Sequence, residues 1–96
     1  MHDSKFVTNI VNKLDKAFIL TSDAFVRIGM QERIASISNY HHYGEWNLAF
    51  KLLCDNLYEF DLPISQQTHK LLEEIGNILE MDRKEWEILK PVNSSR

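Results

Sequence analysis

The chain has 96 residues, of which 44% are hydrophobic, 10% aromatic and 26% charged, and its formal net charge is −3 at pH 7. This balance predicts one folded domain over residues 1–96 and excludes a disordered chain. The acidic charge disfavours nucleic acid as a partner, because nucleic-acid binders usually carry a basic surface. The longest apolar runs have four residues, far short of the roughly 20 of a membrane span, so we expect no membrane partner.

Glycine and proline are scarce, with three and two copies, which favours helices over a β fold rich in turns. Apolar residues at helical spacing predict a first helix over about 5–18. The cluster Thr21-Ser22-Asp23 predicts a turn, since these residues favour the position before a helix. A second helix is expected over about 23–41, and Gly29 indicates a possible break in it.

Three further helices follow the turn at Tyr43-Gly44. Residues 45–59 are apolar on almost every side, which is typical of a central helix. Proline at position 63 ends that helix, and Ser65 is placed to cap the next one. Asp82 and Glu85 have the spacing of a capping box, so a short helix is expected over about 83–89.

These elements predict an all-α fold, a compact antiparallel bundle of about five helices. The helix over 45–59 and the helix after Ser65 are expected to pair at the centre, because the loop between them is short. Residues 91–96 are expected to form a frayed tail.

The residues offer little for catalysis or metal binding. His41 and His42 are adjacent, so they point about 100° apart on a helix, and Glu45 is the one further ligand at suitable spacing. Cys54 is the only cysteine and lies in an apolar run, which favours a buried thiol over a nucleophile. We therefore expect no catalytic residues, no metal site, no cofactor and no enzyme activity.

Acidic residues are concentrated in the C-terminal half. Residues 55–87 contain nine acids and three bases, for a net charge of −6. Asp55 and Glu59 share one helix face, and like charges at this spacing are slightly destabilising. The pattern is compatible with an ordinary solvated surface, but it also suits a surface that attracts a basic protein. The candidate binding residues are Asp55, Glu59, Asp61, Glu73 and Glu74.

The stretch over residues 43–65 resembles the MafI-type immunity proteins, which are encoded beside bacterial polymorphic toxins. The matching features are the Gly44-Glu45 turn, a helix reading A-x-x-L-L-C-D-N-L-Y-E, and the Pro-Ile-Ser segment after it. Residues 75–79 and the segment from Asp82 to Trp86 also fit. The resemblance covers about residues 34–90, and it implies cytoplasmic neutralisation of a toxin, often a nuclease, by direct binding. A generic helical hairpin is the alternative interpretation of the same residues.

We therefore expect a cytoplasmic immunity protein that binds the C-terminal domain of a cognate toxin as a 1:1 complex and occludes its active site. A nuclease of RNase type must present cationic groups to phosphate, so carboxylates could occupy its cleft in place of phosphates. Trp46, Tyr58 and Phe60 are candidate aromatic anchors. The alternatives are a helical adaptor or regulatory domain that binds another bacterial protein, and a small helical enzyme subunit.

Overall fold

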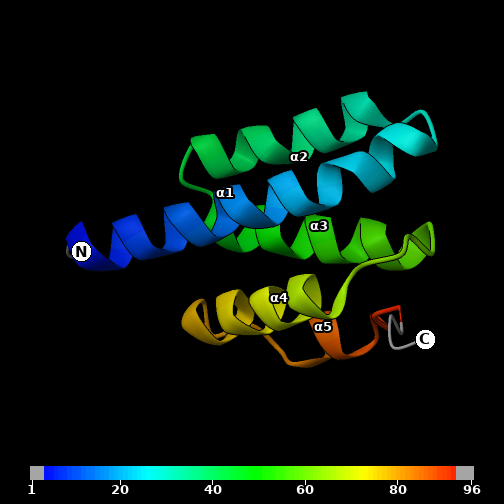
Figure 1. The fold of residues 1–96 in the computed structure, drawn as a ribbon. Helices are drawn as coiled ribbons and strands as arrows, with labels where there is room; N and C mark the ends of the chain where they lie inside the picture. Colours follow the sequence, from blue (N-terminus) through cyan, green and yellow to red (C-terminus); the bar gives the residue numbers. More distant parts are fainter. Residues whose placement is uncertain (1–3, 93–96) are drawn as a thin grey trace.

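The computed structural model describes residues 4–92, and in this range the chain forms five α-helices (Figure 1). They are α1 (Ser4–Arg27), α2 (Gln31–His42), α3 (Trp46–Glu59), α4 (Gln66–Ile78) and α5 (Lys84–Glu87). Each of α2, α3 and α4 runs in roughly the opposite direction to the helix before it. The radius of gyration of 12.9 Å is that of a compact chain of this length. The predicted all-α antiparallel bundle is confirmed. Among the described helices, none combines the length and the apolar character that crossing a membrane requires.

Helix α1 is nine residues longer at its C-terminal end than the sequence indicated. Thr21, Ser22 and Asp23 lie within the helix and do not form the predicted turn. The Thr21 side chain is buried, and its hydroxyl donates to the carbonyl of Ala17 at 2.8 Å. Because that bond satisfies the hydroxyl inside the helix, Thr21 has no need to act as a cap. The buried stripe continues to Phe25, which is fully buried.

The chain reverses at Gly29, the position where the sequence indicated a possible break. Gly29 has a φ of +76°, a left-handed conformation that glycine adopts without steric cost. The amide of Met30 donates to the carbonyl of Phe25 at 2.9 Å, which closes the end of α1. The predicted helix over 23–41 is therefore two pieces: the end of α1 and the whole of α2.

Helix α3 has nearly its predicted bounds and supplies much of the core. Phe50 and Leu53 are fully buried, and Asn56 is the buried polar residue of this helix. The Asn56 side chain donates to the carbonyl of Leu52 at 2.8 Å and accepts from the Arg33 guanidinium at 2.9 Å. Arg33 also lies over the Phe60 ring, 5.9 Å from its centre. These contacts fasten the end of α3 to α2.

Helix α4 begins with a side-chain cap, whereas α5 does not. The Ser65 hydroxyl accepts from the amide of Thr68 at 3.0 Å, so the predicted cap of α4 is confirmed. At α5 the Asp82 carboxylate accepts from the amide of Lys84 at 2.9 Å, but the capping box is not completed. The Glu85 carboxylate accepts from Lys51 of α3 at 3.4 Å. The helix also spans only Lys84–Glu87, shorter than the predicted 83–89.

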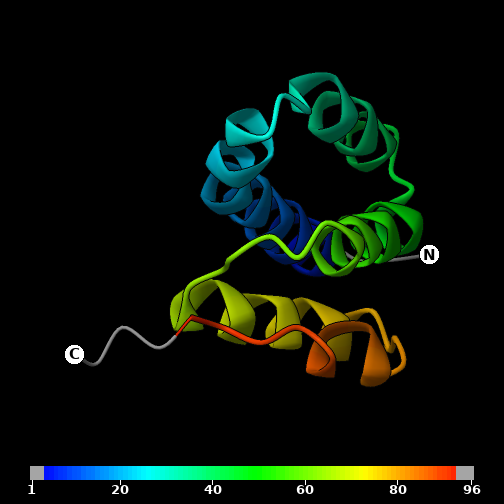
Figure 2. The ribbon, with the colours of Figure 1, turned by 90° about the vertical axis from the view of Figure 1, so that its right-hand side faces the viewer.

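The helices pack in an order that differs from the prediction. Helix α3 packs mainly against α2 and α4 mainly against α1, so the expected central pair of α3 and α4 is wrong. Figure 2 shows α4 and the C-terminal segment as a layer beneath α1 and α3. The short α5 joins this layer to α3, because Trp86 is 2% exposed and meets the Phe50 ring edge-on at 6.1 Å.

The C-terminal segment returns to the start of α4. Leu89 is buried, and the amide of Val92 donates to the carbonyl of Ile64 at 2.8 Å. The predicted frayed tail therefore does not include Val92, and its residues 93–96 lie outside the described part of the chain.

Candidate functional site

Three of the five predicted binding residues meet at the C-terminal end of α3. Asp55, Glu59 and Asp61 line one open hollow of about 750 Å³ together with Tyr58. We call this the acidic hollow. Glu59 is the last residue of α3, and Asp61 follows in the turn. The i, i+4 spacing of the two helical acids brings them to one face, as the sequence indicated.

The position of this hollow on α3 increases its negative potential. The C-terminal end of a helix carries roughly half a negative charge, so lysine or arginine is usually favoured there. Helix α3 has no basic residue in its last turn. Within residues 4–92, neither Glu59 nor Asp61 forms an ion pair. The carboxylates and the helix end therefore act together to attract a cation.

Asp61 reaches the acidic hollow from a strained backbone position. Its φ of 52° is in the left-handed region, where most residues with side chains are disfavoured. The turn is closed by the amides of Asp61 and Leu62, which donate to the carbonyls of Tyr58 and Leu57 at 3.1 and 3.0 Å. Glycine is the usual residue at such a helix end. An aspartate there gives up some stability and places a carboxylate at the rim.

Asp55 is partly neutralised by a lysine on the same helix. The Lys51 ammonium, one turn earlier, lies 3.3 Å from the Asp55 carboxylate and 3.4 Å from that of Glu85. The hydrogen bond and charge of Asp55, followed by those of Glu85, raise the pKa of Lys51 above its ordinary value. The most available negative charge of the acidic hollow therefore lies at Glu59 and Asp61.

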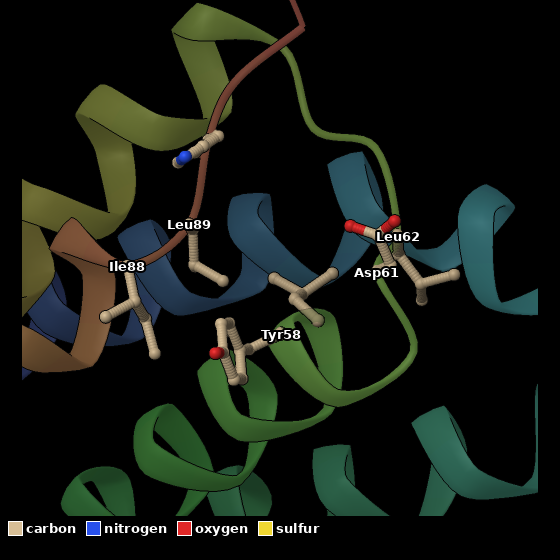
Figure 3. A pocket seen from close by; sticks show the side chains of 7 residues that line it. Tyr58, Asp61, Leu62, Ile88 and Leu89 are labelled. Atoms are coloured by element: carbon tan, nitrogen blue, oxygen red, sulfur yellow. The ribbon is translucent and has the colours of Figure 1, made fainter.

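A second hollow of about 250 Å³ adjoins the first and shares Tyr58 and Asp61 with it. We call it the mixed hollow. Figure 3 shows the Tyr58 ring between Ile88 of the C-terminal segment and Asp61 of the turn. Tyr58 and Ile88 are 59% and 43% exposed, so both are open to a partner. The other lining residues are Leu57, Leu62, Leu89 and Lys90.

The remaining two predicted acids line neither hollow. Glu73 is exposed on α4. Glu74 pairs with Lys13 of α1 at 3.0 Å, and it shares a small hollow with Lys16 and Lys70. Glu74 thus helps to join α4 to α1 in a basic setting. The structure separates the predicted five residues into one group of three and a pair elsewhere.

The aromatic anchors separate in a similar way. Tyr58 alone lines the acidic and mixed hollows. Trp46 is half-buried against Phe6, and Phe60 lies under Arg33. The sequence could not indicate Ile88 and Leu89, because the return of the C-terminal segment past α3 has no local signal.

Comparison with protein-family models, with curated proteins and with solved structures gives no match.

Residues 4–92 also contain a cysteine and three histidines. Cys54 is 1% exposed, so the expected buried thiol is confirmed, and burial raises its pKa. His69 is close to the carbonyl of Trp86, with Nε2 at 3.0 Å from it. His41 and His42 lie near Asp15 of α1, which corrects the expectation that Glu45 is their one further candidate ligand. Asp15 is 26 residues before His41, so spacing could not indicate it.

Proposed function

We propose that this chain is an immunity protein whose acidic and mixed hollows bind a basic toxin domain, an RNase-like nuclease, in a 1:1 complex. The observation that carries the proposal is the acidic hollow, which is lined by three carboxylates and a tyrosine at a helix C-terminus. The resemblance of residues 43–65 to MafI-type immunity proteins supports the same function, since that stretch includes the whole of α3.

The two hollows suit arginine or lysine side chains of the partner. Each such side chain has an apolar stem and a cationic head. Glu59 and Asp61 offer charge to the head, while Tyr58 and Ile88 offer exposed apolar surface to the stem. Arginine also stacks on aromatic rings, so Tyr58 can act as an anchor. The partner surface that fits is therefore basic and rich in long side chains.

A nuclease cleft has this character because it must hold phosphates with cationic groups. The chain would occupy the cleft with carboxylates and so exclude the nucleic acid. Long-range attraction between the two surfaces would speed their encounter, while the contacts of the mixed hollow would slow dissociation. No catalytic step by the immunity protein is needed.

The test uses the protein encoded by the reading frame directly upstream of this chain, produced as its C-terminal domain. Cells that make this domain should grow only when they also make the chain, and the two proteins should co-purify in equal amounts. Replacing Asp55, Glu59 and Asp61 by Asn, Gln and Asn should abolish protection. A matched control replaces Asp23, Glu32 and Glu80 by Asn, Gln and Gln, three exposed acids that line neither hollow.

The control keeps the size of the change in net charge but leaves the acidic hollow intact. Protection by the control and not by the first variant supports the proposal. Full protection by both variants would place the interface elsewhere. Equal loss of protection in both variants would show that overall charge matters and the acidic hollow does not.

A helical adaptor remains the second candidate, favoured by an apolar groove between α1 and α2. The groove has a volume of about 470 Å³, and its wall includes Ile19, which is 74% exposed, and Val26. An amphipathic helix of a partner would fit such a groove. Replacing Ile19 by Gln should then abolish partner binding, whereas the immunity proposal predicts no effect.

A further inference from the structure

Three side chains with metal-binding atoms meet where the end of α2 packs against α1. They are Asp15 of α1 and the consecutive residues His41 and His42, and one ligand atom of each lies within 4.8 Å of the other two. The three residues also line a hollow of about 260 Å³ with Val11, Gly44 and Trp46. An ion could therefore reach them from solvent.

His41 is held in place before any ion binds. It is 3% exposed, its ring stacks on Phe18 at 5.9 Å, and its Nε2 lies 2.7 Å from a carboxylate oxygen of Asp15. The His42 ring centre is 5.3 Å from that of His41. The two rings therefore lie close together, although consecutive residues leave a helix about 100° apart. Asp15 and His42 are exposed and can adjust.

The separations are close to those of a coordinated ion. Zinc bonds to nitrogen and oxygen are about 2.0–2.2 Å long, so tetrahedral ligand atoms are roughly 3.3 Å apart. Asp15 and His41 would have to open from 2.7 Å by about 0.6 Å, and His42 would have to move inward. Both changes fall on Asp15 and His42, the two exposed side chains of the cluster.

The donor set and the setting select the kind of ion. Two imidazoles and one carboxylate, without a thiolate, suit Zn²⁺, Co²⁺, Ni²⁺ or Cu²⁺ better than Mg²⁺ or Ca²⁺. The negative end of α2 lies beside the cluster, because His41 and His42 are its last two residues. This end of the helix favours a cation.

We propose that Asp15, His41 and His42 form a binding site for one divalent transition-metal ion, with water completing the coordination. The buried Nδ1 of His41 has no hydrogen-bond partner. Metal-bound histidines almost always have such a partner, and its loss typically weakens binding by 10–100-fold. The site is therefore expected to bind Zn²⁺ in roughly the micromolar range, not as tightly as a structural zinc site.

The test is calorimetric titration of the full chain with Zn²⁺, using protein purified without a polyhistidine tag. Wild type should bind one equivalent, and one equivalent of Co²⁺ should give visible absorption bands. His42→Ala and Asp15→Asn should each weaken Zn²⁺ binding by at least tenfold. The matched controls His69→Gln and Asp23→Asn should leave the affinity unchanged, because both residues lie outside the cluster.

Circular dichroism checks that each variant is folded. If Asp15→Asn does not fold, the test relies on His42→Ala alone. His42 is exposed, so its removal leaves the core intact. Absence of saturable binding at one equivalent would overturn the proposal. Equal affinities for wild type and the folded His42→Ala variant would overturn it as well.

Discussion

Asp61 and Glu80 share an uncommon backbone conformation, with φ values of 52° and 58°. Each follows the end of a helix, α3 and α4 respectively, where glycine is the usual residue. The two positions differ in surroundings, since Asp61 lines the acidic and mixed hollows and Glu80 lines neither. Comparing the two positions therefore separates the stability cost of the left-handed backbone from the contribution of the carboxylate to binding.

Asp61→Gly and Glu80→Gly should each raise the free energy of unfolding by about 0.5–1 kcal/mol. Relief of the left-handed strain exceeds the extra chain entropy that glycine adds to the unfolded state. Urea unfolding measures both changes. Binding of the toxin domain should weaken only for Asp61→Gly, although each variant loses one negative charge. Equal binding of the toxin domain by the two variants would show that Asp61 is not part of the interface.

Cys54 gives a prediction about chemical reactivity. The thiolate is the nucleophilic form, and burial raises the pKa of this thiol, so the folded protein contains very little thiolate. Alkylation by iodoacetamide should be slow in the folded chain and should stay slow as the pH rises to 9. In guanidinium the same thiol should react quickly. At pH values below its ordinary pKa, the alkylation rate should rise about tenfold for each unit by which the pH increases. A folded rate within a few-fold of the unfolded rate would show that Cys54 is accessible.

At the scale of elements, helix ends were predictable where their signals are local. Leu62 before Pro63 and the Ser65 cap place the end of α3 and the start of α4 correctly, because both act on neighbouring backbone groups. The predicted end of α1 was wrong because the Thr21 hydroxyl can either cap a helix or form a hydrogen bond within one. Burial of its side chain against the rest of the bundle decides between the two, and that burial has no local signal.

The joint between α4 and α5 depends on Gly76, which is buried against Trp86. A Cβ at position 76 would overlap the Trp86 ring. Alanine in place of glycine normally stabilises a helix by about 1 kcal/mol, but overpacking a core costs about 1–3 kcal/mol. Gly76→Ala should therefore lower the free energy of unfolding, as measured by urea denaturation.

The control is the same substitution in a Trp86→Leu background. The smaller side chain removes the overlap, so Gly76→Ala should then be neutral or stabilising. Stabilisation of the wild-type background by Gly76→Ala would contradict the packing of Trp86 on α4.

At the scale of the whole molecule, periodicity predicts helices but not which helices touch. The short loop between α3 and α4 suggested a pair, yet α4 packs mainly on α1, and Glu74 reaches Lys13 there. The same limit applies to sites. Asp55, Glu59 and Asp61 are close in sequence, so their grouping was predictable. Asp15 and the C-terminal segment reach their neighbours only through tertiary packing, which spacing does not encode.

Binding through the acidic hollow is the central claim, and the association rate constant tests it most directly. Stopped-flow mixing with the upstream toxin domain would cover about 10–150 mM salt, over which the screening length falls from about 30 to 8 Å. The wild-type rate should fall steeply with salt, since charge steering raises such rates by about 10–1,000-fold. The variant with Asp55→Asn, Glu59→Gln and Asp61→Asn should associate at least tenfold more slowly at low salt. The control with Asp23→Asn, Glu32→Gln and Glu80→Gln should stay within about threefold of wild type. Equal rates for the two variants at every salt concentration would contradict the claim.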